Sequence, residues 1–265
     1  MTVRQSTGLR NYLMQNGSFR GAFQGGKLSI YSGAQPATAD TAPSGTLLVT
    51  ITDGAGAHTP EVRATATITI SGTSGTITGI TLGGVQILGA TVTWATSNDN
   101  TAALIAAQIN KFHGHKIVTA SSATTVVTLT ARLGFGASVN GMVVTTTESG
   151  GDIAGADVNL GAGTGASVAG VSHANGLNFD GVATGLLAKL TGQTWSGTGL
   201  ADGTAGWFRL RGPITDDDSA DSAGAFTRLD GSIAVSGGDM NASTTTLASG
   251  ATHTISTFSP TEPAA

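Results

Sequence analysis

Apolar residues in this chain recur in short runs that alternate with threonine, serine and other polar residues. The run at 65–70 (TATITI) shows this most clearly, because every second residue is apolar. Strict alternation is typical of strands that bury one face. Strands are expected at residues 27–31, 47–51, 65–70, 77–82, 85–88, 91–94, 117–120, 125–131, 142–145, 177–182, 206–210, 226–235 and 252–258.

The N-terminal segment has helical rather than alternating spacing. Leu9, Tyr12 and Leu13 fall on one face of a helix, and Ser6 or Thr7 can cap its first turn. An apolar stripe on a terminal helix can pack on its own core or on a neighbouring subunit. We take Leu9, Tyr12 and Leu13 as candidate assembly contacts.

Two further helices are expected, a short one at 19–23 and a longer one at 101–112. Asp99 or Asn100 can cap the longer helix. Its stripe consists of Leu104, Ile105, Gln108, Ile109 and Phe112. This spacing is typical of an amphipathic helix that lies on a sheet.

The order of these elements predicts two domains, one inserted into the other. Residues 1–58 and 172–265 form a discontinuous antiparallel β-sandwich or jelly-roll-like domain. Residues 61–160 form a small inserted α+β domain, with one helix across an antiparallel sheet. Residues 161–171 are rich in glycine and alanine, as a return linker would be. The fold class is therefore mainly β.

Composition narrows the function classes. Glycine accounts for 40 of 265 residues and charged residues for 11%, while 39% of residues are hydrophobic, which indicates a folded chain with many turns. The formal charge is −4, and the 12 basic residues are scattered, so we expect no nucleic-acid partner. No segment approaches the roughly 20 apolar residues of a membrane span, so we expect no membrane partner. The sequence contains no cysteine, so the fold uses no disulfide.

Several segments of the discontinuous domain resemble small structural proteins of tailed-bacteriophage virions. They are 8–13 (GLRNYL), 28–40 (LSIYSGAQPATAD), 45–48 (GTLL), 176–179 (GLNF), 203–209 (GTAGWFR), 228–233 (RLDGSI) and 237–241 (GGDMN). Shorter relatives run from the first blocks directly to the GLNF block, which supports the insertion. The inserted domain is similar to a small module of phage tail and surface proteins, through 77–88 (ITGITLGGVQIL), 106–110 (AAQIN) and 136–141 (GASVNG). The resemblance implies assembly on the particle, with residues 1–58 and 172–265 as the particle-attachment domain, and supplies no catalytic residues.

Two groups of residues were weighed as metal sites. His113 and His115 form a close pair at the expected end of a helix, but a zinc site normally needs three or four ligands. Asp216, Asp217, Asp218 and Asp221 are the densest charge in the chain. Their spacing lacks the calcium-loop pattern, so a solvated turn is favoured over a calcium site.

Aromatic residues offer the only candidate sugar contacts. Trp207 lies in an apolar strand, so core packing is expected there. Trp195 lies in a polar stretch and is expected to be the more exposed, and Trp94 belongs to the inserted domain. Trp94 and Trp195 are therefore the candidates for glycan contact. His58 and His173 flank the insertion and are expected to meet near its junction.

Together these observations predict a virion structural protein that acts by assembly. A capsid-decorating or head-surface protein is favoured; the alternative is a tail, collar or fibre-attachment component whose inserted domain binds a host surface glycan. No paired carboxylates, Ser/His/Asp arrangement or nucleotide loop stands out, so we expect neither enzymatic activity nor a cofactor. The expected partners are other phage structural proteins and further copies of the chain, with a trimer as the first guess.

Overall fold

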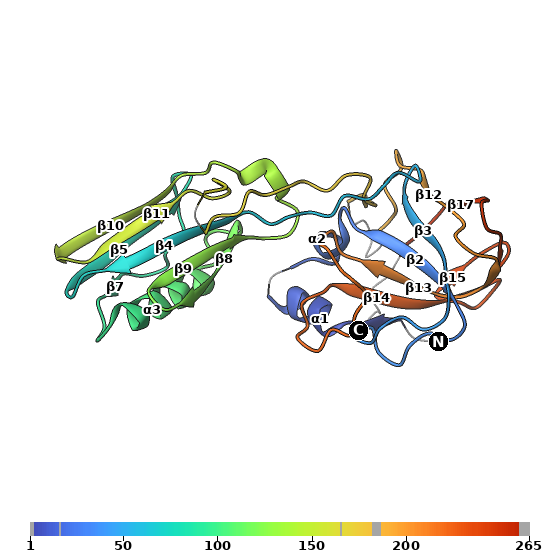
Figure 1. The fold of residues 1–265 in the computed structure, drawn as a ribbon, viewed down its shortest axis with the longest axis horizontal. Helices are drawn as coiled ribbons and strands as arrows, with labels where there is room; N and C mark the ends of the chain where they lie inside the picture. The colour runs from blue at the N-terminus through green and yellow to red at the C-terminus, as the bar shows by residue number, and fades with distance from the viewer. Residues whose placement is uncertain (1–2, 16, 165, 182–186, 260–265) are drawn as a thin grey trace. The chain divides into compact units, whose positions relative to one another are not determined.

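The computed structural model describes residues 3–15, 17–164, 166–181 and 187–259. The chain divides into two compact units (Figure 1). Unit 1 consists of residues 1–61 and 173–265, and unit 2 consists of residues 62–172. Strands dominate both units, which confirms the mainly β prediction.

Unit 1 contains one nine-stranded sheet and two short helices. Its elements are β1 (Arg4–Gln5), α1 (Thr7–Met14), α2 (Phe19–Phe23), β2 (Lys27–Ser32), β3 (Leu47–Asp53), β12 (Trp195–Thr198), β13 (Gly203–Arg211), β14 (Arg228–Ala234), β15 (Met240–Asn241), β16 (Thr246–Leu247) and β17 (Thr252–Ile255). The strand order is β1-β14-β13-β2-β3-β12-β17, with β15 added to β14 and β16 added to β13. All pairs are antiparallel except β14 with β15.

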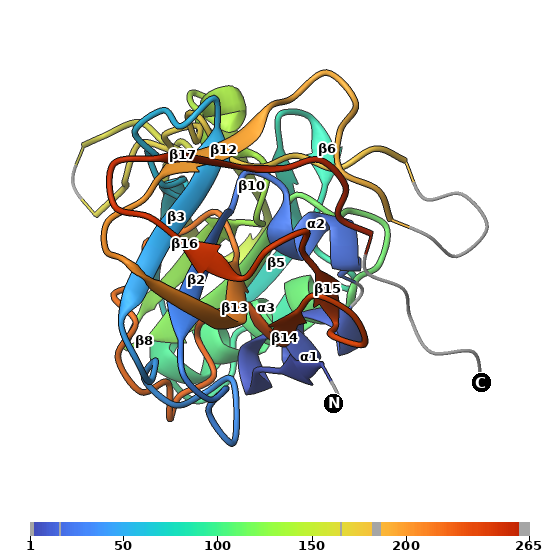
Figure 2. The ribbon, with the colours of Figure 1, turned by 90° about the vertical axis from the view of Figure 1, so that its right-hand side faces the viewer.

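The central strands of unit 1 are buried on both faces. In β2, Leu28 and Ile30 point into the apolar core, whereas Ser29 and Tyr31 are buried on the opposite side. Successive side chains of a strand point to opposite faces, so this burial means that both faces are covered. Figure 2 shows the C-terminal strands β16 and β17 in front of β2 and β3 in unit 1.

The two predicted N-terminal helices are confirmed. Ser6 caps α1, because its side chain accepts a hydrogen bond from the backbone N–H of Leu9 at 3.1 Å. Ser18 caps α2 in the same way, through the N–H of Gly21 at 3.0 Å. Leu9 belongs to the core of unit 1, so α1 is packed on its own unit through this residue.

Unit 2 contains two four-stranded sheets and one long helix. Its elements are β4 (Thr65–Ser71), β5 (Gly75–Leu82), β6 (Val85–Gln86), β7 (Val92–Thr93), α3 (Asn98–Lys111), β8 (Val118–Ala123), β9 (Val126–Ala131), a 3-10 turn (Gly136–Val139), β10 (Val144–Gly151) and β11 (Ala154–Val158). One sheet has the order β10-β5-β6, with β7 paired to β5, and the other has the order β11-β4-β9-β8. The expectation of a single sheet is therefore wrong.

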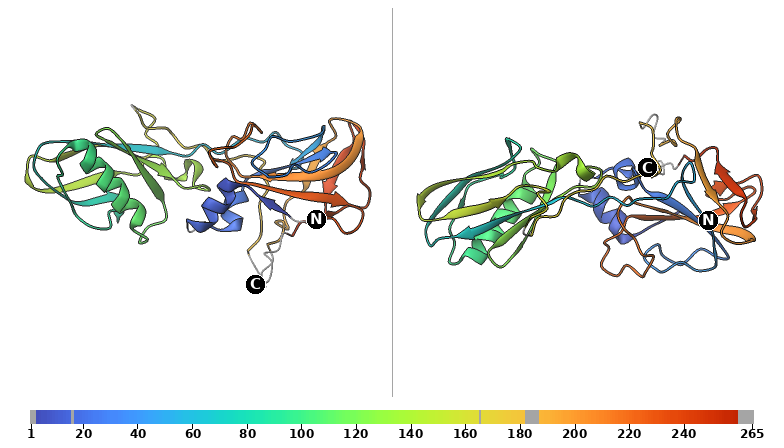
Figure 3. Two further views of the ribbon diagram at one scale, coloured as in Figure 1. Left: turned by 90° about the horizontal axis from the view of Figure 1, so that it is seen from below. Right: turned by 45° about the horizontal axis from the view of Figure 1, so that its top comes forward.

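A single aliphatic core holds unit 2 together. It joins Ile68 of β4, Ile80 of β5, Ile105 of α3 and Leu129 of β9, all fully buried. Figure 3 shows α3 along one side of the strands, where it contacts β4, β8 and β9. Leu104 was expected in the buried stripe but is 45% exposed.

The segment expected as a return linker belongs to unit 2. Ser167 is buried, and its hydroxyl donates to the backbone carbonyl of Thr65 at 2.8 Å. Val171 pairs with Val62 through two backbone hydrogen bonds of 2.9 Å. The unit therefore extends to Ser172, because the glycine-rich composition hid backbone pairing that only the fold supplies.

One further strand prediction ends at a residue that the structure does not describe. The strand expected at 177–182 is replaced by isolated pairings of Leu177 with Gly26 and of Phe179 with Lys189, and its last residue lies outside the described residues.

Within the described part of the chain, no helix is long and apolar enough to cross a membrane.

Candidate functional site

The second face of the unit 1 sheet carries a buried layer of charged and aromatic side chains. Phe208 and Leu210 of β13 point into the apolar core, so the alternating Trp207, Arg209 and Arg211 point to the other face. The same alternation places Tyr31 of β2 in this layer. We call this set the polar layer; its members are Ser29, Tyr31, Trp207, Arg209, Arg211, Arg228, Asp230 and Ser232, all buried.

Bidentate ion pairs neutralise two of the arginines. Arg209 donates from Nε and Nη2 to the two carboxylate oxygens of Asp230, both at 2.8 Å, and neither side chain is exposed. Arg228 donates in the same geometry to Asp216, at 2.7 and 2.6 Å. Two parallel charge-assisted hydrogen bonds fix geometry more strictly than a single contact does.

The third arginine joins the layer to an aromatic pair. Arg211 contacts both the carboxylate of Asp218 and, at 2.5 Å, the hydroxyl of Tyr31. The ring of Tyr31 stacks on Trp207 with centroids 4.5 Å apart, and the guanidinium of Arg209 lies 5.4 Å from the Trp207 ring. Charge, hydrogen bonding and ring stacking are thus combined in one continuous network.

Two long loops cover the polar layer and are fixed to it by hydrogen bonds and ion pairs. The first loop, between β2 and β3, accepts hydrogen bonds at Thr41 from Arg209 (3.0 Å) and at Ser44 from the indole of Trp207 (3.2 Å). The second loop, between β13 and β14, contributes Asp216 and Asp218. The loops therefore have a defined conformation although neither contains a helix or strand.

Burial and ion pairing act in opposite directions on the acids of the layer. Burial alone would raise the pKa of Asp216. Hydrogen bonds from Arg228 and from the backbone N–H of Asp218, together with the charges of Arg228 and Arg211, outweigh burial and hold the pKa below its ordinary value. Burial raises the pKa of Asp230, and Arg209 opposes this only in part. Burial also raises the pKa of Tyr31, so its hydroxyl stays protonated and can donate.

The acidic run at 216–221 is not the solvated turn that was expected. Asp216 pairs with Arg228, and Asp218 pairs with Arg211. Asp221 is buried and accepts hydrogen bonds from the backbone N–H groups of Ala225 and Phe226, at 2.9 and 2.8 Å. No group of three or more His, Cys, Asp or Glu side chains suited to a metal ion occurs among the described residues.

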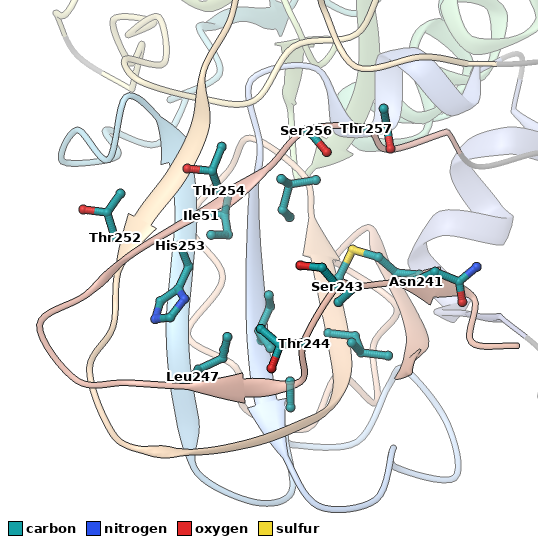
Figure 4. Close-up of a pocket in the computed structure, with 16 residues that line it drawn as sticks. Ile51, Asn241, Ser243, Thr244, Leu247, Thr252, His253, Thr254, Ser256 and Thr257 are labelled. Carbon is teal, nitrogen blue, oxygen red and sulfur yellow. The ribbon is translucent and has the colours of Figure 1, made fainter. Parts of the chain in front are cut away.

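The opposite face of the same sheet borders a cavity of about 330 Å³. Its floor consists of the buried apolar side chains Ile30, Ile51, Ala205, Ile233 and Leu247. Figure 4 shows β17 and the following residues along one side, with Asn241, Ser243 and Thr244 along the other. A smaller cavity of about 220 Å³ shares Met240, Asn241 and Thr257 with it.

The two candidate glycan contacts belong to different units. Trp195 is fully buried, where it packs against Phe179 and Phe258 with centroids 5.2 and 5.6 Å apart, so the prediction that it is exposed is wrong. Trp94 lies in unit 2, partly buried against the core, and its indole donates to Asn98 at 2.8 Å. The residues next to Trp195 are polar or glycine, so the sequence suggests exposure. They are nevertheless buried, because this segment pairs through its backbone with β3 and β17.

The candidate assembly contacts on α1 face inward to different degrees. Leu9 is fully buried in the unit 1 core, so it is not available as an assembly contact. Tyr12 and Leu13 are partly buried against the same core. The exposed apolar side chain of this helix is Met14, at 86%.

The histidines occupy structural positions. His115 is buried near the C-terminal end of α3, and burial lowers its pKa, so the neutral imidazole is favoured there. The segments that carry His58 and His173 meet as predicted, because the adjacent residues Thr59 and Ala174 pair through two backbone hydrogen bonds of 3.0 and 3.1 Å. The ring of His58 approaches the carbonyl of Gly25 at 3.0 Å, and burial lowers its pKa.

Comparison with known proteins gives no relative. No protein-family model, curated protein or solved structure matches this chain. Function must therefore be argued from the sequence and the geometry of the two units.

Proposed function

We propose that this chain is a structural protein of a tailed-bacteriophage virion, most simply one that decorates the head surface. It acts by assembly and carries out no chemical step. Unit 1 attaches to other structural proteins of the particle, and unit 2 is the part displayed at the particle surface. The location is therefore the virion, and the partners are phage structural proteins and further copies of this chain.

One observation carries this proposal: the sequence blocks that resemble phage virion proteins converge in unit 1. The block at 28–40 contains β2, which pairs with β13 from the block at 203–209, and β13 pairs with β14 from the block at 228–233. The block at 237–241 ends in β15, which pairs with β14. Blocks spread over more than two hundred positions therefore make one contiguous sheet.

The same blocks supply most of the polar layer. Tyr31, Trp207, Arg209, Arg228 and Asp230 all belong to them. If the resemblance arose by chance between glycine-rich sequences, the matching residues would not be expected to belong to one buried network. This supports a common architecture for unit 1 and the phage proteins that it resembles.

The ordered loops suit an assembly surface. Asp40 of the first loop accepts from the backbone N–H and the hydroxyl of Thr7, both at 2.8 Å, so the loop is tied to α1. Its backbone carbonyl accepts from the N–H of Asp221 at 2.7 Å, so the two loops are tied to each other. Loops ordered before binding lose less conformational entropy when they dock.

We expect unit 1 to associate with further copies of itself, with a trimer as the first symmetry to test. Edge strands that carry little charge favour association, because their backbone N–H and C=O groups are unpaired. In an oligomer with closed symmetry, neighbouring copies can cover these edges. Light scattering on the purified chain should give about three times the monomer mass of 26.1 kDa.

Copy number tests the assignment. Purified particles of a phage that encodes this chain are digested, and the chain is quantified by mass spectrometry against the major capsid protein. Head decoration predicts hundreds of copies per particle. A few copies would favour the tail, collar or fibre-attachment alternative, and absence from purified particles would overturn the virion assignment.

A further inference from the structure

The larger cavity of unit 1 lies between two backbone segments rather than inside a closed core. Residues 252–257, which include β17, line one side, and residues 240–244 line the other (Figure 4). Side chains from β2, β3, β13, β14 and β16 form the floor. The cavity is thus an elongated slot on the sheet, and we call it the β17 slot.

The β17 slot has no acidic lining residue, and its one ionisable side chain is the imidazole of His253. None of its 16 lining residues is Lys, Arg, Asp or Glu. The floor is apolar and buried, whereas Ser243, Thr252 and Thr254 on the two sides are exposed. A ligand that fits must place an apolar group on the floor and hydrogen-bonding groups along the sides.

The backbone of β17 is open toward a further partner. β17 is the last strand in the order of the sheet: it pairs with β12 on one side, and no described strand pairs with its other side. Exposed strand edges are usually protected by charged residues, proline or a bulge. The four residues Thr252–Ile255 contain neither Lys nor Pro, so these two protections are missing from this edge.

We propose that the β17 slot accepts an extended, uncharged peptide segment of a neighbouring virion protein, which adds to β17 as a further strand. Backbone groups of the segment pair with β17, and one apolar side chain enters the slot above Ile51 and Ile233. The source of the segment rests on the proposed function; the strand-accepting property of the slot does not.

The combination of features favours a peptide over a small neutral molecule such as a sugar. An open backbone edge supplies regularly spaced donors and acceptors, which an extended peptide matches along its whole length. No Phe, Tyr or Trp side chain lines the slot, whereas neutral sugars are commonly held by stacking on such rings. The volume of about 330 Å³ is at the lower end for ligand pockets, which suits one or two side chains.

The test uses the full chain and a synthetic probe. The probe is a seven-residue peptide of alternating threonine and valine with blocked termini, titrated into 15N-labelled protein and followed by NMR. The expected result is saturable shifts at residues 252–257 and 240–247. A matched peptide with the same side chains, N-methylated at every second amide, should bind about tenfold more weakly or not at all because it lacks donors.

Two variants connect the binding to the slot. Thr254→Lys places a charge on the β17 edge, and about tenfold weaker binding is expected because the ammonium group opposes burial by the peptide. Ser121→Lys is the control: Ser121 is also exposed on an end strand, β8 of unit 2, but lines neither cavity. This variant should bind the probe like the parent protein.

Three results would overturn the proposal. They are the absence of saturable shifts, equal binding of the N-methylated peptide, and binding that Thr254→Lys leaves unchanged. Saturable shifts at the slot with maltotriose but not with the peptide would also reject it, in favour of a saccharide site. Because these measurements use purified protein, they remain valid if the chain proves absent from virions, so failure of the slot and failure of the virion assignment are distinguishable.

Discussion

The two units of this protein bury their strands in different ways. Unit 2 has an aliphatic core of Ile, Val, Leu and Ala, and its buried polar residues are Thr67, Thr101, His115 and Ser167. Unit 1 has an aromatic-rich core on one face of its sheet and a charged layer on the other. The ion pairs that join Arg209, Arg211 and Arg228 to aspartates all belong to this charged layer of unit 1 and its covering loops.

Because of this difference, the stability of the two units should depend on different features. Aliphatic cores tolerate rearrangement as long as volume is kept. A buried ion pair does not, because loss of one partner leaves an uncompensated charge in a poorly solvated place. Unit 1 should therefore depend on individual residues of the polar layer, and unit 2 on its total apolar volume.

The largest effect is expected from Arg209→Met. This change leaves the carboxylate of Asp230 buried without its partner and should destabilise unit 1 by about 3–5 kcal/mol. In calorimetry, the transition of unit 1 should shift while that of unit 2 stays in place. The control is Arg10→Met, because Arg10 is exposed on α1; a similar loss in both variants would contradict the special role of the buried pair. Adding Asp230→Leu to Arg209→Met should recover much of the stability.

The next effect is expected in the core of unit 2. Ile105 is fully buried on α3, so Ile105→Ala should cost about 2–5 kcal/mol through lost burial and the cavity left behind. Leu104→Ala is the matched control, because Leu104 is the adjacent residue but is 45% exposed. Chemical denaturation that affects both variants equally would contradict the observed orientation of α3.

A smaller effect is expected at the start of the same helix. The side chain of Ser97 accepts from the N–H of Asn100 at 3.2 Å, so Ser97→Ala should cost about 1 kcal/mol. Ser122→Ala, on the exposed part of β8, should be nearly neutral. If Asp99→Ala costs more than Ser97→Ala, the cap is not Ser97.

The smallest effect is electrostatic and concerns Asp152. Hydrogen bonds from the backbone N–H of Thr73 and the side chain of Ser74 lower the pKa of this exposed carboxyl to about 2. A lowered pKa in the folded state stabilises the fold above the ordinary pKa of Asp, and this contribution is lost as pH falls from about 4 to about 2. NMR titration should give that value, and Asp152→Asn should remove this part of the pH dependence. An ordinary pKa near 3.9 would contradict the described turn.

Regular elements could be predicted from the sequence where one side of an element was apolar. The alternation at 65–70 and the helical stripe around Ile105 are examples, and both elements are present. The strand β12 was missed because Trp195–Thr198 (WSGT) has no apolar alternation; it is buried by pairing with β3 and β17. The cap of α3 was assigned to the wrong residue, since several adjacent residues can cap a helix.

The sequence contains a pattern that indicates the polar layer. Arg209 and Arg211 alternate with Phe208 and Leu210 in a chain with only 11% charged residues, so strands with a charged second face were indicated. Their partners could not be assigned, because the pairing of Asp216 with Arg228 depends on how a loop folds back over the sheet. The β17 slot is likewise a property of distant segments and has no local pattern.

The most direct test of the proposed function is the position of this chain on intact particles. Antibody raised against residues 62–172 is added to purified phage, which is then imaged by electron microscopy. Head decoration predicts label distributed over the whole shell. Label confined to the tail or to one vertex would contradict the head-surface assignment, and absence of label from both intact and disrupted particles would contradict a role in the virion.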